Sequence, residues 1–178
     1  MYNLSLTACS FFLQKTNSKK AADIYALNRP LITDSTAGVK ISVVDLFELF
    51  FQNCAEIRKD SNKQQSFSCD LSSEHISETD DYKMICVRML SGIYGSSSDI
   101  LDGNTHKLKY RKKSTDIDTR PFYVFVVIPK DSEKVVVQKG ILIFQNVGPF
   151  GIKTITTENM QAFFSETFQL LLLYSISL

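Results

Sequence analysis

Apolar and polar residues follow a helical period in one early stretch of the chain. In residues 42–59, SVVDLFELFFQNCAEIRK, the apolar side chains recur every three or four positions: Val43, Leu46, Phe47, Phe50, Phe51, Cys54 and Ile57. This spacing places them on one face of a helix, which we predict over Val43–Arg58. Ser42 is suited to the N-cap, and Asp45 brings a carboxylate to the positive end of the helix dipole.

The second half of the chain is instead typical of strands. Phe122–Ile128 is a continuous apolar run, which fits a central strand buried on both faces. PKDSE then forms a turn, and Val135–Gln145 returns as a long strand with a natural bulge site at Lys139 and Gly140. NVGPFG forms the next turn, before Ile152–Thr156. Successive strands joined by short turns predict an antiparallel meander.

Outside the predicted helix Val43–Arg58, the first 81 residues contain weaker patterns. An opening strand is predicted by alternation, with an apolar side formed by Leu4, Leu6, Ala8 and Phe12. A short helix is predicted near Lys19–Leu27. Residues 60–81 are polar and acidic, and we interpret them as a solvated loop, although paired carboxylates there also suit acid–base chemistry or a divalent ion.

A second helix is predicted over Glu158–Leu173, with Thr157 as its cap. Beyond Gln169 the sequence LLLLYSISL is apolar on every side, so a helix there must be covered on every side. The core, a second subunit or the rest of a longer protein can each provide this cover. We therefore predict a partner interface at the C-terminal helix, formed by Phe168, Leu171, Leu172 and Leu173.

These elements predict an α+β fold. We expect a mostly antiparallel sheet of about five to seven strands, covered on one face by the Val43–Arg58 and Glu158–Leu173 helices. The 178 residues fit a single domain, 1–178, and the apolar C-terminal end also suits the N-terminal module of a longer protein.

Composition and charge narrow the function classes. The chain has 20 basic and 19 acidic residues, so polyanion binding requires local clustering of cations. Its four cysteines are widely spaced and it has two histidines, so we expect free thiols, no metal and no cofactor. The apolar runs are shorter than the roughly 20 residues of a membrane span, which predicts a cytoplasmic protein without a membrane partner.

The stretch HKLKYRKK, residues 106–113, is the strongest local cluster of cations. In a strand, Lys107, Lys109, Arg111 and Lys113 share one face at intervals of about 6.6 Å, a spacing that suits a phosphate backbone. We therefore predict a nucleic-acid-binding surface at these residues. The alternative is a solvated edge strand whose charge is neutralised by nearby aspartates: Asp99, Asp102, Asp116 and Asp118.

Two further functions stay open beside a non-enzymatic recognition and assembly module. The first is a metal-dependent nuclease using Asp131, Glu133 and Lys139, although these residues lack the Glu-x-Lys order of such sites. The second is a purely structural oligomerisation domain. No motif for a nucleophile elbow or a phosphate-binding loop is present in the sequence, and this favours a protein that is not an enzyme.

One segment resembles a known group of proteins. The apolar strand, the IPK turn, the GILIFQ strand and the GIKT segment before a helix, between Arg120 and about Phe164, are similar to uncharacterised proteins encoded in bacterial anti-phage defence regions. The resemblance implies a role in defence and an N-terminal module of a larger protein. It transfers no catalytic residue.

Overall fold

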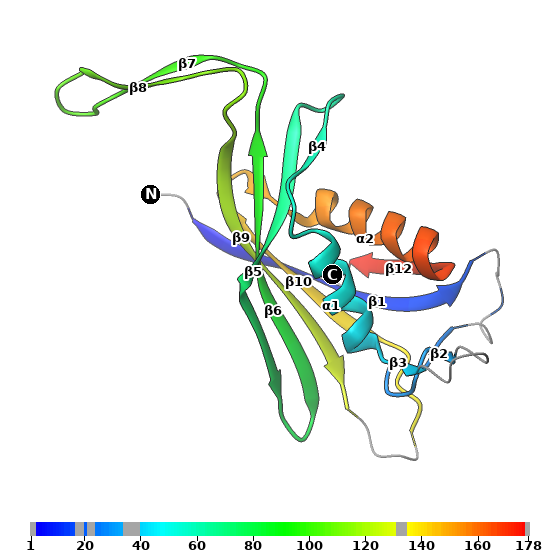
Figure 1. Ribbon diagram of the computed structural model, residues 1–178. Helices are drawn as coiled ribbons and strands as arrows, with labels where there is room; N and C mark the ends of the chain where they lie inside the picture. Colours follow the sequence, from blue (N-terminus) through cyan, green and yellow to red (C-terminus); the bar gives the residue numbers. More distant parts are fainter. Residues whose placement is uncertain (1–2, 17–19, 21–23, 34–39, 131–134, 177–178) are drawn as a thin grey trace.

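A computed structural model describes residues 3–16, 20, 24–33, 40–130 and 135–176. It shows the α+β fold that the sequence predicts (Figure 1). The helices are α1 (Val43–Asn53) and α2 (Lys153–Phe168). The strands are β1 (Leu4–Lys15), β2 (Ile32–Thr33), β3 (Lys40–Ile41), β4 (Arg58–Asp60), β5 (Gln65–Glu78), β6 (Tyr82–Ile93), β7 (Ser98–Leu101), β8 (Leu108–Lys112), β9 (Asp118–Pro129), β10 (Gly140–Val147), β11 (Phe150–Gly151) and β12 (Leu170–Ile176).

One large antiparallel sheet organises the molecule. Its strand order is β12-β1-β10-β9-β6-β5-β4, and β11 pairs with β10 to make it eight-stranded. Two ribbons, β2–β3 and β7–β8, stand apart from it. The sheet curls into a half-barrel, and both helices lie on its concave side (Figure 1).

The core fills the space between the helices and the concave side of the sheet. The predicted apolar stripe is buried there from Val43 to Cys54, whereas Ile57 lies beyond the helix and is exposed. Phe47 contacts both Phe11 of β1 and Phe164 of α2 with edge-to-face rings. Alternate residues of each central strand complete the core, among them Cys9, Ile85, Val87, Met89, Phe122, Val124, Val126, Leu142 and Phe144.

Helix α1 begins as predicted and ends earlier. Ser42 Oγ accepts the backbone N–H of Asp45, whose carboxylate accepts the N–H of Ser42, so both groups cap the helix. The helix ends at Asn53 rather than at Arg58. The carbonyl of Cys54 accepts the backbone N–H of Cys69, which turns the chain into the sheet, and Arg58 begins edge strand β4.

The prediction of a helix over Glu158–Leu173 is wrong at both ends. Helix α2 begins at Lys153, and Thr157 is buried inside it, donating its hydroxyl hydrogen bond to backbone carbonyls of the preceding turn. Gln169 has φ 54°, a left-handed conformation that ends the helix. The following leucines form strand β12 beside β1, because Leu170 and Leu172 alternate into the core.

Four weaker predictions are also corrected. Residues 65–78, predicted as loop, form the long strand β5. Strand β10 begins at Gly140 rather than at Val135. In β1 the residues that face the core are Cys9, Phe11 and Leu13, the opposite side from the apolar series that starts at Leu4. Of the helix predicted near Lys19–Leu27, residues 19 and 21–23 lie outside the described residues, and residues 24–27 are not helical, since Ile24 forms a strand bridge with Gln14.

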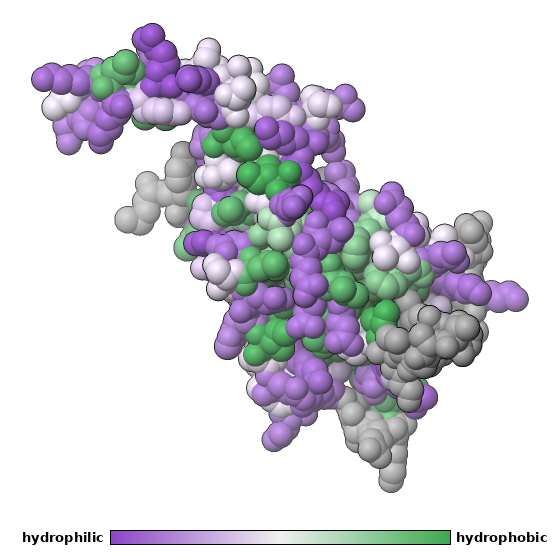
Figure 2. Space-filling model, viewed as in Figure 1, coloured by the Kyte–Doolittle hydropathy of each residue, from purple (hydrophilic) through white to green (hydrophobic). Residues whose placement is uncertain are grey.

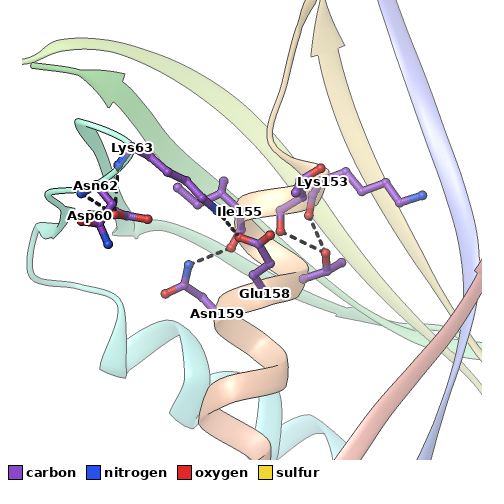
Figure 3. A network of polar contacts seen from close by, with 9 residues as sticks. Asp60, Asn62, Lys63, Lys153, Ile155, Glu158 and Asn159 are labelled. Atoms are coloured by element: carbon purple, nitrogen blue, oxygen red, sulfur yellow. Dashed lines mark hydrogen bonds and ion pairs between the residues drawn. The ribbon is translucent and has the colours of Figure 1, made fainter.

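Side chains of α2 tie it to both ends of the sheet. Lys63, in the β4–β5 turn, forms an ion pair with Glu158 at 3.0 Å, and Asp60 accepts the backbone N–H of Lys63 in the same turn (Figure 3). At the other edge, Gln161 Oε1 accepts the backbone N–H of Leu172 in β12 at 3.1 Å. The exposed ion pair contributes little to stability, roughly 0–1 kcal/mol.

Candidate interaction surfaces

A two-stranded ribbon, Ser98–Lys112, projects from the body, and we call it the arm (Figure 1). The strand predicted in HKLKYRKK is present as β8, which pairs with β7. The register places Asp99 opposite Arg111 and Ile100 opposite Tyr110. Alternation therefore gives the arm a charged side, with Lys109 and Arg111, and an apolar side.

Aspartates of the arm neutralise two of the predicted phosphate-binding cations. Arg111 Nε lies 2.8 Å from Asp99 Oδ1, and Lys109 Nζ lies 3.1 Å from Asp102 Oδ2. Lys107 and Lys113 lie just outside β8 and form no ion pair within 4 Å among the described residues. The predicted row of four cations is thus reduced to two unpaired ones at its ends.

Asp102 organises the tip of the arm. Its carboxylate accepts the backbone N–H groups of Thr105 and Asn104, at 2.9 and 3.0 Å, and pairs with Lys109. These contacts, with the N–H of Thr105 the strongest, lower the pKa of Asp102 to about 2. Asp102 is therefore ionised throughout the physiological pH range.

The apolar side of the arm is uncovered. Its side chains are each about half exposed: Ile100, Leu101, Leu108 and Tyr110. Hydrophobic atoms are visible among the hydrophilic ones on the arm in Figure 2. A two-stranded hairpin is marginally stable alone in water, so this arm presents apolar surface without packing of its own.

The convex side of the sheet, which we call the outer face, is apolar too. Cross-strand pairs such as Ala8–Ile143, Ile143–Phe125 and Cys86–Phe125 point to this side, opposite the helices. Polar residues on this side include Ser10, Gln145 and Thr119. The apolar residues of the outer face are Leu4, Leu6, Ala8, Phe12, Met84, Cys86, Leu90, Tyr123, Phe125, Val127, Ile141, Ile143 and Leu173. Leu4 and Leu6 are 68% and 65% exposed, and Tyr123 and Ile141 are each 40% exposed.

Charge is almost absent from the outer face. On the neighbouring strands β12, β1, β10, β9 and β6, Arg88 is the one charged residue among the described residues that point to the outer face. Its guanidinium binds the carboxylate of Asp70 on the neighbouring strand β5, with Nε 3.0 Å from Oδ2. Hydrogen bonds from the Ser72 side chain and from Arg88 lower the pKa of Asp70, so the pair is ionised and internally neutral.

The residues of the predicted partner interface do not lie together. Leu172 is buried in the core, and Phe168 is half-buried against it. Leu173 points to the outer face, opposite Phe12. The side chain of Leu171 lies outside the described residues. Of the three whose side chains the structure describes, Leu173 is the one that points to the outer face.

The acidic residues of the β5–β6 hairpin do not gather into a catalytic site. Glu78 pairs with Lys130 and Lys83, and its hydrogen bond from Lys130 is the main cause of its lowered pKa. Burial, with the nearby charge of Glu48, raises the pKa of Glu74. The two carboxylates thus lie in different environments and do not form one shared ion-binding site.

A hollow of about 800 Å³ lies beside the beginning of α1. Its lining mixes Arg29, Lys83 and Lys130 with Asp80 and Asp81. The backbone N–H of Asp45 in the first turn of the helix is already bonded to Ser42. The hollow therefore offers mixed charge without a convergent set of donors.

Two of the three residues of the nuclease hypothesis lie in a segment that the structure does not describe. Asp131 and Glu133 lie outside the described residues, and Lys139 is exposed in the segment before β10. Across the described ranges, no three His, Cys, Asp or Glu side chains lie where they would hold a metal ion. Nor does any helix described have the length and apolar character needed to cross a membrane.

The outer face is the surface that sequence reasoning missed. The one sequence signal for the outer face was the apolar run Phe122–Ile128, which predicted a strand buried on both sides. In the structure the helices cover the side of Val124 and Val126, whereas Tyr123 and Phe125 face outward. The sequence pattern thus indicates that the outward side of β9 is also covered, and no element of the described chain covers it.

Comparison with protein-family models, with curated proteins and with solved structures finds no match to this chain.

Proposed function

We propose that this chain is a non-enzymatic assembly module that binds a protein partner through its outer face. One observation carries the proposal: the outer face exposes Leu4, Leu6, Tyr123 and Ile141 around half-buried apolar neighbours, and its single charged residue is already paired. Contiguous apolar surface of this kind is typical of protein interaction sites.

The alternation of the sheet supports this reading. An antiparallel sheet with one solvated side normally carries polar residues on that side. Here β9 and β10 carry Phe125, Val127, Ile141 and Ile143 on the side away from the helices. Full burial of such a side chain is worth about 1.5–3 kcal/mol relative to full exposure, and a partner supplies the part of this that the half-buried side chains still lack.

The shape of the outer face favours a macromolecule over a small ligand. Small-molecule sites are concave and enclose most of the ligand surface. The outer face is the convex side of a half-barrel (Figure 1). A convex apolar surface suits docking to another protein surface.

Native complex size tests the proposal. In extracts of the cells that make this protein, the wild type is expected to elute well above 20.2 kDa, and the double variant Leu6→Lys, Ile141→Lys at the monomer size. Both side chains are exposed, so the variant is expected to keep the wild-type circular dichroism spectrum. The control Leu49→Lys changes a leucine of α1 that is also 40% exposed but lies on the helix side. Elution of the wild type as a monomer would refute the proposal.

Nucleic-acid binding by the arm is the second candidate. The arm is a free two-stranded ribbon, and the DNA major groove admits such a ribbon. Residues 98–113 contain five Lys or Arg and two Asp, a formal charge of +3. The ion pairs of Lys109 and Arg111 are exposed and weak, so phosphates are able to compete with the aspartates.

Salt dependence tests this candidate. If Lys107, Lys109, Arg111 and Lys113 contact phosphates, affinity for short DNA or RNA duplexes falls with salt, and the double variant Lys107→Ala, Lys113→Ala lowers the slope of log affinity against log salt by about 2. Lys15→Ala, an exposed lysine on the body, is the matched control and is expected to leave the slope unchanged. Binding that is absent, or equal in both variants, excludes the arm as the contact.

A further inference from the structure

We infer that the partner on the outer face is a second copy of this chain, related by a two-fold axis. The inference rests on the proposed function, which requires only that some protein covers the outer face. The charge of the face and the position of the arm each point to self-association.

The charge of the outer face suits contact with itself. In a two-fold dimer the same patch meets itself, so any net charge on the patch is repelled. Arg88 is neutralised by Asp70 of its own copy, and the other outward residues from β12 to β6 that the structure describes are uncharged. A second copy therefore meets no like charge, and an oppositely charged partner has no charge to recognise.

The outer face by itself reaches at most the lower limit of area for a specific dimer interface. Strands about 4.8 Å apart, with a rise of about 3.3 Å per residue, give four strands of about eight residues a flat outline of roughly 500 Å². Two such outlines bury about 1,000 Å², the size from which specific interfaces are seen. Because each face is convex, two faces meet over only part of this outline.

The arm supplies further contact area. In Figure 1 it leaves the body on the side away from the helices, which is the side of the outer face. A copy seated on the outer face is then flanked by the arm, and two-fold symmetry places the arm of each copy beside the other. The half-exposed Leu101, Leu108 and Tyr110 provide an apolar surface for this contact.

Sedimentation of the purified full-length chain tests the inference, over about 1–100 µM, the range in which a micromolar dimer dissociates. We expect the wild type at twice 20.2 kDa. Each substitution acts twice in a two-fold dimer, so Leu6→Lys is expected to raise the dimer dissociation constant about a hundredfold or more, and Leu108→Lys about tenfold. Leu49→Lys, the control on the helix side, is expected to leave it unchanged.

The outcomes separate this inference from the proposed function. A purified wild type that stays monomeric, with a larger complex still present in native extracts, overturns the second copy as partner but leaves the assembly function standing. A dimer that Leu6→Lys does not weaken also overturns the inference, since another surface then holds the copies together. A dimer weakened by Leu6→Lys but unchanged by Leu108→Lys contradicts the role of the arm.

Discussion

Replacing Phe47 by alanine will lower the free energy of unfolding by about 3–5 kcal/mol, the usual cost of removing a buried phenylalanine. The ring is fully buried and lies edge-to-face against Phe11 at 5.3 Å and Phe164 at 5.4 Å between centroids. It therefore joins α1 to both β1 and α2. Domains of this kind are stable by only about 5–15 kcal/mol, so the loss is a large part of the total.

Urea denaturation followed by circular dichroism measures this effect. Leu49→Ala, in the same helix, is the matched control: the side chain is 40% exposed, and we expect a loss of no more than about 1 kcal/mol. If Phe47→Ala costs as little as the control, the three rings do not form the centre of the core.

Gly140→Ala is expected to destabilise the protein by about 1–3 kcal/mol through overpacking. Gly140 begins β10 opposite Phe11 of β1, and an added methyl group would overlap the Phe11 ring and lie 3.0 Å from the carbonyl oxygen of Val127. The Phe11 ring is itself packed on Phe47, so it cannot move aside without disturbing the core.

Gly103→Ala is the matched control for this effect, because a methyl group there meets no atom within 4 Å. Its loss of backbone freedom in the unfolded chain is expected to leave stability unchanged or raise it by roughly 0.4–1 kcal/mol. Both variants are compared by thermal unfolding. Equal unfolding temperatures for the two variants would show that more space surrounds Gly140 than the structure shows.

Local signals explain which elements the sequence predicts well. Helix α1 has a complete stripe and the capping pair Ser42 and Asp45 within a few residues, so its start and type follow from the sequence. The end of α2 has no such signal, because Gln169 adopts a left-handed conformation that is usually left to glycine. Strand β5 is rich in serine, and its state depends on pairing with β6.

The features of the arm and the outer face also differ in whether local sequence predicts them. The alternation of Lys109 and Arg111 on one side of the arm follows from adjacent residues, whereas their pairing with Asp102 and Asp99 depends on the register of the hairpin. The outer face depends on which side of the sheet the helices cover. Periodicity alone does not contain that choice, because Phe122–Ile128 is apolar on both sides.

Gln161 has a consequence for how copies of the molecule can join. Its side-chain oxygen occupies the backbone N–H of Leu172 on the outermost strand, and the opposite margin of the sheet ends in the three-residue β4. A chain that adds beside β12 therefore meets a backbone N–H that is already bonded, and one that adds beside β4 meets a strand of only three residues. Extension of the ladder is thereby hindered at these two borders, whereas the margin of β5 beyond Phe67, which β4 does not pair, stays open to it.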